Sequence, residues 1–151
     1  MQQDLAVVFD CGSTNLTVIV VDAGGTLLSS SSRPNATVQQ SGKPQGWLVW
    51  DLDALWQSLS EACQECLRQV DRTRIAALTV TTWGADGAPV DAAGRPLYPS
   101  ISWQDCRTEP LARGILDVLD PWDIYRITGY QVIPFNTALK LRWLHENEPQ
   151  T

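Results

Sequence analysis

Residues 5–31 read LAVVFDCGSTNLTVIVVDAGGTLLSSS and determine the fold class. Two apolar runs of strand length end at Asp10 and Asp22. Cys-Gly-Ser-Thr-Asn separates these runs, and Ala-Gly-Gly separates the second run from residues 26–31. Because short turns join the consecutive runs, we predict a three-stranded antiparallel meander.

A long helix and a fourth strand are expected next. Residues 33–46 are rich in Pro, Gly, Ser and Gln, which predicts a loop. Asp51 is a good N-cap for an amphipathic helix that extends to about Val70. Residues 75–82 are largely β-branched, which predicts a buried strand parallel to the first. The apolar stripe of the helix would contain Leu52, Leu55, Trp56, Leu59, Cys63, Cys66, Leu67 and Val70.

The C-terminal part is mainly helical. Residues 90–97 suggest a hairpin turn, and helices are expected over 108–119, after Pro121 and from Asn136, with a break at Gly129. We identify no linker, so residues 1–151 are interpreted as one α/β domain with a mixed sheet. A meander with D-x-G-x-T in its first turn, then a helix and a parallel strand, is typical of the ribonuclease H-like, actin-type ATPase fold.

Charge and hydropathy exclude several classes of function. The net charge is −6 and the basic residues are scattered, so the chain lacks the basic stripe that a nucleic-acid-binding protein needs. The longest apolar run, 16–21, is far too short to span a membrane, and the N-terminus does not resemble a signal peptide. We therefore expect a cytoplasmic protein that binds neither nucleic acid nor membrane, with homo-oligomer formation left open.

Cys63 and Cys66 form a C-x-x-C pair, which is found in zinc and redox sites. Both lie on the apolar stripe of the predicted helix, and no second C-x-x-C or paired histidine completes a set of four ligands. Buried structural cysteines are therefore the favoured interpretation.

The first candidate site is the turn Asp10–Asn15. Gly12 removes a Cβ at its centre, the hydroxyl groups of Ser13 and Thr14 add donors, and successive turn amides can form an anion-binding nest. Asp10 could hold a hydrated Mg²⁺ that bridges nucleotide phosphates. An ordinary hairpin turn explains this motif equally well on its own.

The second candidate site is Thr82-Trp83-Gly84-Ala85-Asp86-Gly87, at the end of the predicted parallel strand. Ligands gather beyond the carboxyl ends of strands in such sheets. Gly84 would let a substrate approach the backbone, Asp86 could accept hydrogen bonds from sugar hydroxyl groups, and Trp83 offers an apolar face. The alternative is a turn with one buried tryptophan.

Two further segments admit two interpretations each. Asp105 and Arg107 could form a surface ion pair that contributes little, or Arg107 could support a sugar site from behind. Phe135 is more typical of a core residue than of a ligand contact, and Asn136 is more typical of a helix cap.

Four segments, in this order and at these spacings, resemble the N-terminal part of the FGGY carbohydrate kinases. They read DCGSTN (10–15), VTTWGADG (80–87), GRPLYPSISWQDCRT (94–108) and DIYRITGYQVIPFNTALKLRWL (123–144). Residues 81–108 are similar to L-fuculokinases, residues 123–144 resemble L-fuculokinases and rhamnulokinases about equally, and residues 46–55 are more similar to rhamnulokinases. The match extends over essentially the whole chain.

The resemblance implies a fold of two lobes that hold ATP–Mg²⁺ and a sugar, and transfer of a phosphoryl group to an L-ketose such as L-fuculose or L-rhamnulose. It places the phosphates at Asp10, Gly12, Ser13, Thr14 and Asn15, with Mg²⁺ at Asp10, and the sugar near Trp83, Gly84, Asp86, Phe135 and Asn136. It also implies that the catalytic base and the adenosine-binding lobe lie beyond Thr151, so this chain is expected to be an inactive fragment.

Alternatives to this function stay open. Relatives often carry Arg or Lys two residues after the Asn15 position, where this chain has Thr17, and this difference favours a non-catalytic sugar-binding or regulatory domain. A xylulose, gluconate or glycerol kinase of the same family is a second alternative. Glycerol kinases tend to carry Arg-Glu in place of Gly84-Ala85, so they rank lower.

Overall fold

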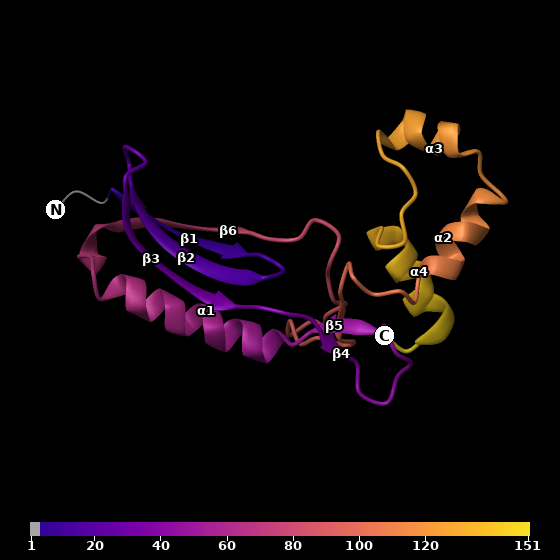
Figure 1. Cartoon of the computed structure of the whole chain (residues 1–151), viewed down its shortest axis with the longest axis horizontal. Coiled ribbons are helices and arrows are strands. Elements are labelled where there is room, and N and C mark those ends of the chain that lie inside the picture. The colour runs from indigo at the N-terminus through magenta and orange to yellow at the C-terminus, as the bar shows by residue number, and fades with distance from the viewer. Residues whose placement is uncertain (1–3) are drawn as a thin grey trace. The chain divides into compact units, whose positions relative to one another are not determined.

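The computed structural model describes residues 4–151, and contacts divide them into two compact units. The first unit comprises residues 4–36 and Asp51–Gly84. The second comprises Thr37–Trp50 and Ala85–Thr151. The chain thus leaves the first unit after its third strand and returns to it at the start of its long helix (Figure 1).

The first unit is a sheet with one long helix. Its elements are β1 (Leu5–Cys11), β2 (Asn15–Asp22), β3 (Leu27–Pro34), α1 (Leu52–Leu67), the 3₁₀ turn η1 (Arg72–Arg74) and β6 (Ile75–Thr81). The strand order is β3-β2-β1-β6. β1 and β3 are antiparallel to β2, and β6 is parallel to β1, which confirms the predicted meander and parallel strand.

α1 lies along one face of the sheet (Figure 1), and the core of the first unit lies between them. Opposed residues on antiparallel strands share a face, so the buried pair Val7 and Val20 belongs to the helix side. Ala62 and Cys66 supply the helix side of this core. Asp51 caps α1 as predicted, since its carboxylate accepts a hydrogen bond from the amide of Ala54.

Two predictions of burial in the first unit are wrong. β6 is an edge strand, and its Leu78 and Val80 are 64% and 57% exposed, because α1 packs on β2 and β3 instead. Trp56, assigned to the apolar stripe, is 73% exposed. Helical spacing assigns a residue to a face, but it does not say whether that part of the face has a neighbour.

The second unit combines short strands with three helices. Its elements are β4 (Val38–Gln39), β5 (Leu48–Trp50), β7 (Ser100–Ile101), α2 (Glu109–Leu116), α3 (Pro121–Thr128) and α4 (Thr137–Asn147). β4, β5 and β7 form an antiparallel sheet in that order. The segment predicted as a loop at 33–46 therefore contains the end of β3 and all of β4.

Helix boundaries in the second unit follow local rules. Asp120 caps α3 by accepting hydrogen bonds from the amides of Trp122 and Asp123, and Pro121 occupies the first helical position. Gly129 ends α3 in the left-handed region with φ of 70°, which confirms the predicted break. Among the described residues, no helix has the length and apolar character needed to cross a membrane.

Arg107 and Asp105 form an ion pair at the centre of the second unit, with side chains 0% and 1% exposed. The surface interpretation of this pair is therefore wrong. The guanidinium carbon lies 4.5 Å from the ring centre of Trp47 and 4.9 Å from that of Trp143. Two hydrogen bonds of 2.8 Å join the side chains of Arg107 and Asp105, so the charge is both paired and surrounded by aromatic faces.

Candidate functional site

The turn that follows β1 is closed by a 3.0 Å hydrogen bond from the Gly12 amide to the Asn15 carbonyl. A Cβ at position 12 would lie 2.8 Å from that same carbonyl oxygen, a contact that side chains essentially never make. Glycine is therefore required by the close approach of the two backbone segments, independently of any ligand. Thr14 and Asn15 at the tip of this turn are exposed.

Asn35, one residue past the end of β3, holds the turn by two hydrogen bonds. Its side-chain amide donates 2.7 Å to the Gly12 carbonyl, and its backbone amide donates 2.8 Å to the Thr14 carbonyl. The peptide bonds are trans, so the N–H of Ser13 points to the opposite side from the Gly12 carbonyl and away from Asn35. An N–H oriented in this way by a fixed carbonyl is the element from which an anion-binding nest is built.

Asn35 was missed at the level of sequence. The only signal is its position one residue after Pro34, which pairs with Asn15 across β2 and β3. This position indicates that Asn35 lies beside the turn only once the register of β2 and β3 is known.

Asp10 lies on the face of the sheet opposite α1 and is exposed. Its cross-strand partner is Thr17, whose hydroxyl forms a 2.9 Å hydrogen bond with Ser32. One exposed carboxylate beside this turn fits Mg²⁺, which proteins usually hold through one or two carboxylates together with substrate phosphates. Thr17 supplies no positive charge beside Asp10.

The parallel pairing of β1 and β6 brings Trp83 to the turn after β1. The register places Asp10 opposite Thr81, so the segments after both strands leave the sheet at the same edge. The indole Nε1 of Trp83 donates a 2.9 Å hydrogen bond to the hydroxyl of Ser13. The two motifs that were predicted separately therefore touch within the first unit. Gly84, the next residue, is exposed, and a Cβ built on it meets no atom within 4 Å.

Asp86, Phe135 and Asn136 belong to the second unit. One carboxylate oxygen of Asp86 contacts the ammonium of Lys140 at 2.6 Å. The other accepts hydrogen bonds from the Trp50 indole at 2.7 Å and from the Trp103 amide at 3.1 Å. The side chain is 2% exposed, so its oxygens are committed to the protein.

Lys140 was not identified from the sequence, where it falls among the apolar residues of the last helix. Its ammonium also donates to the carbonyl of Ala85 at 3.1 Å and to that of Ile101 at 2.9 Å. Burial lowers the pKa of Lys140, and the hydrogen bond to Asp86 opposes that shift. The lysine thus fixes the backbone next to Gly84 and the end of β7.

Phe135 packs edge to face against Trp103, with ring centres 5.9 Å apart. Trp103 is 38% exposed, so this pair presents an aromatic surface beside Asp86, which holds the Trp103 amide. Trp103 was quoted only as part of a motif, and no role was predicted for it.

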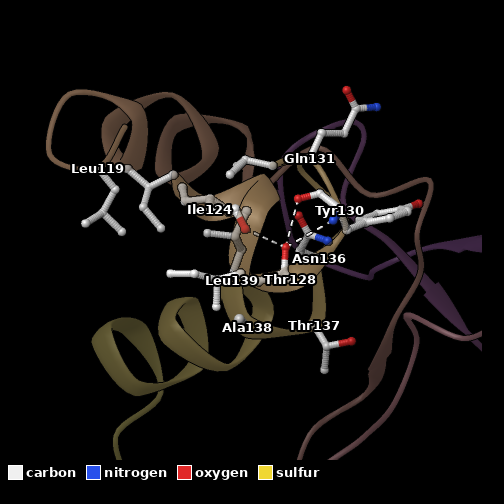
Figure 2. A pocket seen from close by; sticks show the side chains of 12 residues that line it. Leu119, Ile124, Thr128, Tyr130, Gln131, Asn136, Thr137, Ala138 and Leu139 are labelled. Carbon is white, nitrogen blue, oxygen red and sulfur yellow. Dashed lines mark hydrogen bonds between the residues drawn. The ribbon is translucent and has the colours of Figure 1, made fainter. Parts of the chain in front are cut away.

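Asn136 lines a cavity of about 430 Å³ between α2, α3 and α4, shown in Figure 2. The lining is mostly apolar, and the Asn136 side-chain oxygen accepts a 2.8 Å hydrogen bond from the Ile133 amide. The Thr128 hydroxyl group likewise lies within hydrogen-bond distance of the backbone, 2.9 Å from the Ile124 carbonyl and 3.0 Å from the Tyr130 carbonyl. The cavity therefore suits an apolar group better than a sugar, whose hydroxyl groups need polar partners.

The C-x-x-C pair lies in the core of the first unit. Cys66 is fully buried and its thiol donates to the Val18 carbonyl at 3.2 Å, while Cys63 is half-buried. Burial raises the pKa of Cys63, which keeps it in the unreactive thiol form. Within residues 4–151, no group of three or more His, Cys, Asp or Glu side chains could hold a metal ion.

Comparison with known proteins gives consistent matches. The model of the FGGY family of carbohydrate kinases, N-terminal domain, matches residues 5–151. L-fuculokinase from Salmonella typhi is 37% identical over 150 residues, which cover 99% of this chain and 32% of that protein. Rhamnulokinase from Yersinia pestis (strain Pestoides F) is 37% identical over 103 residues, 67% of this chain and 20% of that protein.

Among solved structures, gluconate kinase from Lactobacillus acidophilus superimposes with a TM-score of 0.84 at 20% identity. The match covers 97% of this chain and 29% of that one. This likeness concerns the fold and confirms the predicted ribonuclease H-like class. The chain thus spans about a third of the length of the curated L-fuculokinase that it matches.

Proposed function

Because this chain belongs to the FGGY family of carbohydrate kinases, we propose that it acts in a kinase that transfers the terminal phosphoryl group of ATP to a sugar hydroxyl group. We propose an L-ketose as the sugar, L-fuculose or L-rhamnulose, with the 1-phosphate as product. The 37% identity to L-fuculokinase over 99% of this chain supports that choice.

The turn after β1 is proposed to meet the nucleotide phosphates, through Gly12, Ser13, Thr14 and Asn15. The observation that carries this proposal is the brace from Asn35, which fixes the Gly12 carbonyl and turns the Ser13 amide the other way. Asp10 would hold Mg²⁺, which neutralises charge on the transferred phosphoryl group when it is bound.

Trp83 and Gly84 are proposed to contact the sugar from the first unit. The exposed backbone of Gly84 allows close approach, and the indole of Trp83 offers an apolar face for a sugar ring. Phe135 and Asn136, which belong to the second unit, are also proposed to lie near the sugar. Asp86 is proposed to position Trp103 and the backbone of residues 85–86, since its own oxygens are already bonded.

The residues of this chain would act by binding and orientation. In phosphoryl transfer, most of the catalytic effect comes from positioning and charge stabilisation. No acidic residue of the chain is proposed as the general base.

The test is an assay of the complete gene product with ATP–Mg²⁺ and a panel of L-fuculose, L-rhamnulose, xylulose, gluconate and glycerol. Turnover of either L-ketose supports the proposal, and turnover of another member of the panel alone would replace the substrate. Absence of turnover on all five would refute it, and sugar binding without nucleotide affinity would then favour the regulatory alternative.

A substitution at Gly12 tests whether the turn after β1 contributes to the measured activity. Gly12→Ala is expected to lower kcat/KM at least tenfold, because the new methyl group would displace the Asn15 carbonyl. Gly114→Ala is the matched control, since a Cβ there meets no atom within 4 Å. Equal activity of the two variants would contradict a role of the turn.

A further inference from the structure

The hydrogen bond between Trp83 and Ser13 joins the proposed sugar contact to the proposed phosphate turn. Both residues follow the carboxyl ends of neighbouring parallel strands, and the donor and acceptor lie 2.9 Å apart. Both side chains are half-buried, which limits competition from water.

The chemistry of the two groups makes this contact directional. An indole nitrogen can only donate, so the Ser13 hydroxyl must accept on one lone pair and direct its own proton elsewhere. Asn35 meanwhile fixes the Gly12 carbonyl, which belongs to the same peptide unit as the Ser13 amide. Ser13 is therefore held by Asn35 through its backbone and by Trp83 through its side chain. A rotation of the Trp83 ring would release the second of these restraints.

We propose that the Trp83–Ser13 hydrogen bond couples sugar binding to nucleotide binding, an inference that rests on the proposed function. A sugar that packs against the Trp83 ring restricts the indole and with it the Ser13 hydroxyl. Phosphates that contact Ser13 restrict the same hydrogen bond from the other end. Each ligand then binds to groups that the other has already ordered, and the coupling must be equal in both directions.

The strength of one neutral hydrogen bond determines the expected coupling between sugar and nucleotide binding. The nucleotide should bind about three- to tenfold more tightly when the sugar is present, which is the range expected for a single bond of this kind. The same factor should appear for the sugar when the nucleotide is present.

The test uses the complete gene product, a non-hydrolysable ATP analogue with Mg²⁺, and the ketose that the assay above identifies. Calorimetry gives the dissociation constant of the analogue with and without saturating ketose, and the ratio of the two is the coupling factor. Trp83→Phe keeps an aromatic ring and removes the donor, and Ser13→Ala removes the acceptor. Trp56→Phe and Ser30→Ala are matched controls at exposed positions of the same unit.

The coupling factor should fall to about one in each single variant, and the double variant should show no further loss. The control variants Trp56→Phe and Ser30→Ala should show the same coupling factor as the unaltered protein. A factor of one in the unaltered protein, or an unchanged factor in Trp83→Phe and Ser13→Ala, would overturn the coupling while leaving the proposed function intact. If the unaltered protein binds neither ligand, both proposals are wrong.

Discussion

The ammonium group of Lys140 lies 2.6 Å from the carboxylate of Asp86, and the two side chains are 5% and 2% exposed. The pair is hydrogen-bonded to four other groups in the second unit: the Ala85 carbonyl, the Ile101 carbonyl, the Trp50 indole and the Trp103 amide. A buried ion pair of this kind is costly to break, because removal of one partner leaves the other charge unpaired.

Lys140→Met should therefore destabilise the second unit by about 3–5 kcal/mol. The double variant Lys140→Met/Asp86→Leu should recover much of that loss, since neither charge of this pair is then left buried without its partner. Hydrogen–deuterium exchange of peptides covering 85–87 and 137–144 in the complete gene product measures the change locally. Lys43→Met, at a more exposed lysine, is the control and should have little effect. Equal exchange in the Lys140 and Lys43 variants would contradict the structural role of the pair.

Arg107→Lys should destabilise the second unit by about 2–4 kcal/mol, although the charge is kept. A lysine cannot make the paired hydrogen bonds to Asp105, nor present a planar face to Trp47 and Trp143. The measurement is the urea dependence of tryptophan fluorescence. Arg113→Lys, whose side chain is 79% exposed, should shift the transition by less than about 0.5 kcal/mol. A similar shift in both variants would contradict the importance of the planar group.

Local sequence signals predicted most of the elements correctly. The meander, α1, the parallel pairing of β6 and the ends of α3 follow from turn residues, caps and periodicity, all of which act within a few residues. The family resemblance identified the residues around which the candidate site is built.

Contacts between distant residues explain what could not be predicted. Asp86 is bonded to Lys140, 54 residues away, and a buried carboxylate has the same sequence appearance as one that binds a sugar. The exposure of β6 depends on where α1 packs, which no pattern within β6 records. Asn35 became recognisable only after the register of β2 and β3 was known.

Asn35→Ala should raise the dissociation constant of ATP–Mg²⁺ about three- to tenfold, because the Gly12 carbonyl loses its side-chain partner and the turn becomes less ordered. Calorimetry on the complete gene product checks this. Asn147→Ala is the control, since it removes a side-chain amide that bonds the Trp143 carbonyl at the end of α4. Unchanged nucleotide affinity in Asn35→Ala would mean that the brace does not serve phosphate binding.

The hairpin between β2 and β3 should weaken in acid. Hydrogen bonds from the backbone amide of Thr26, and also from Gly24, hold the pKa of Asp22 below its usual range. A carboxylate whose pKa is lowered by folding stabilises the fold fully above its unfolded pKa of about 4, and this contribution is lost as the pH falls through the folded value. Protection factors from hydrogen exchange of peptide 22–28 should drop over that window. Asp22→Asn should reduce this loss of protection at low pH, whereas Asp53→Asn should not. If protection of peptide 22–28 depended on pH identically in the two variants, the Asp22 carboxylate would not be its cause.

Thr17→Lys should tighten nucleotide binding. Thr17 lies opposite Asp10 on the face of the sheet away from α1, and its hydroxyl group forms a hydrogen bond with the hydroxyl group of Ser32 on the adjacent strand. A lysine there would add a positive charge close to the proposed phosphate turn, and we expect a three- to tenfold lower dissociation constant for ATP–Mg²⁺, on the order of one screened charge pair.

A second variant distinguishes the effect of the added charge on nucleotide affinity from the effect of losing the Thr17 hydroxyl group. Thr17→Val removes the hydrogen bond to Ser32 without adding a charge, and it should leave nucleotide affinity unchanged or slightly weaker. The gain in Thr17→Lys should shrink as ionic strength rises, because salt screens an exposed charge. Calorimetry at low and high ionic strength distinguishes the two effects. If lysine and valine bind the nucleotide equally at low ionic strength, the turn after β1 does not hold the phosphates where we propose.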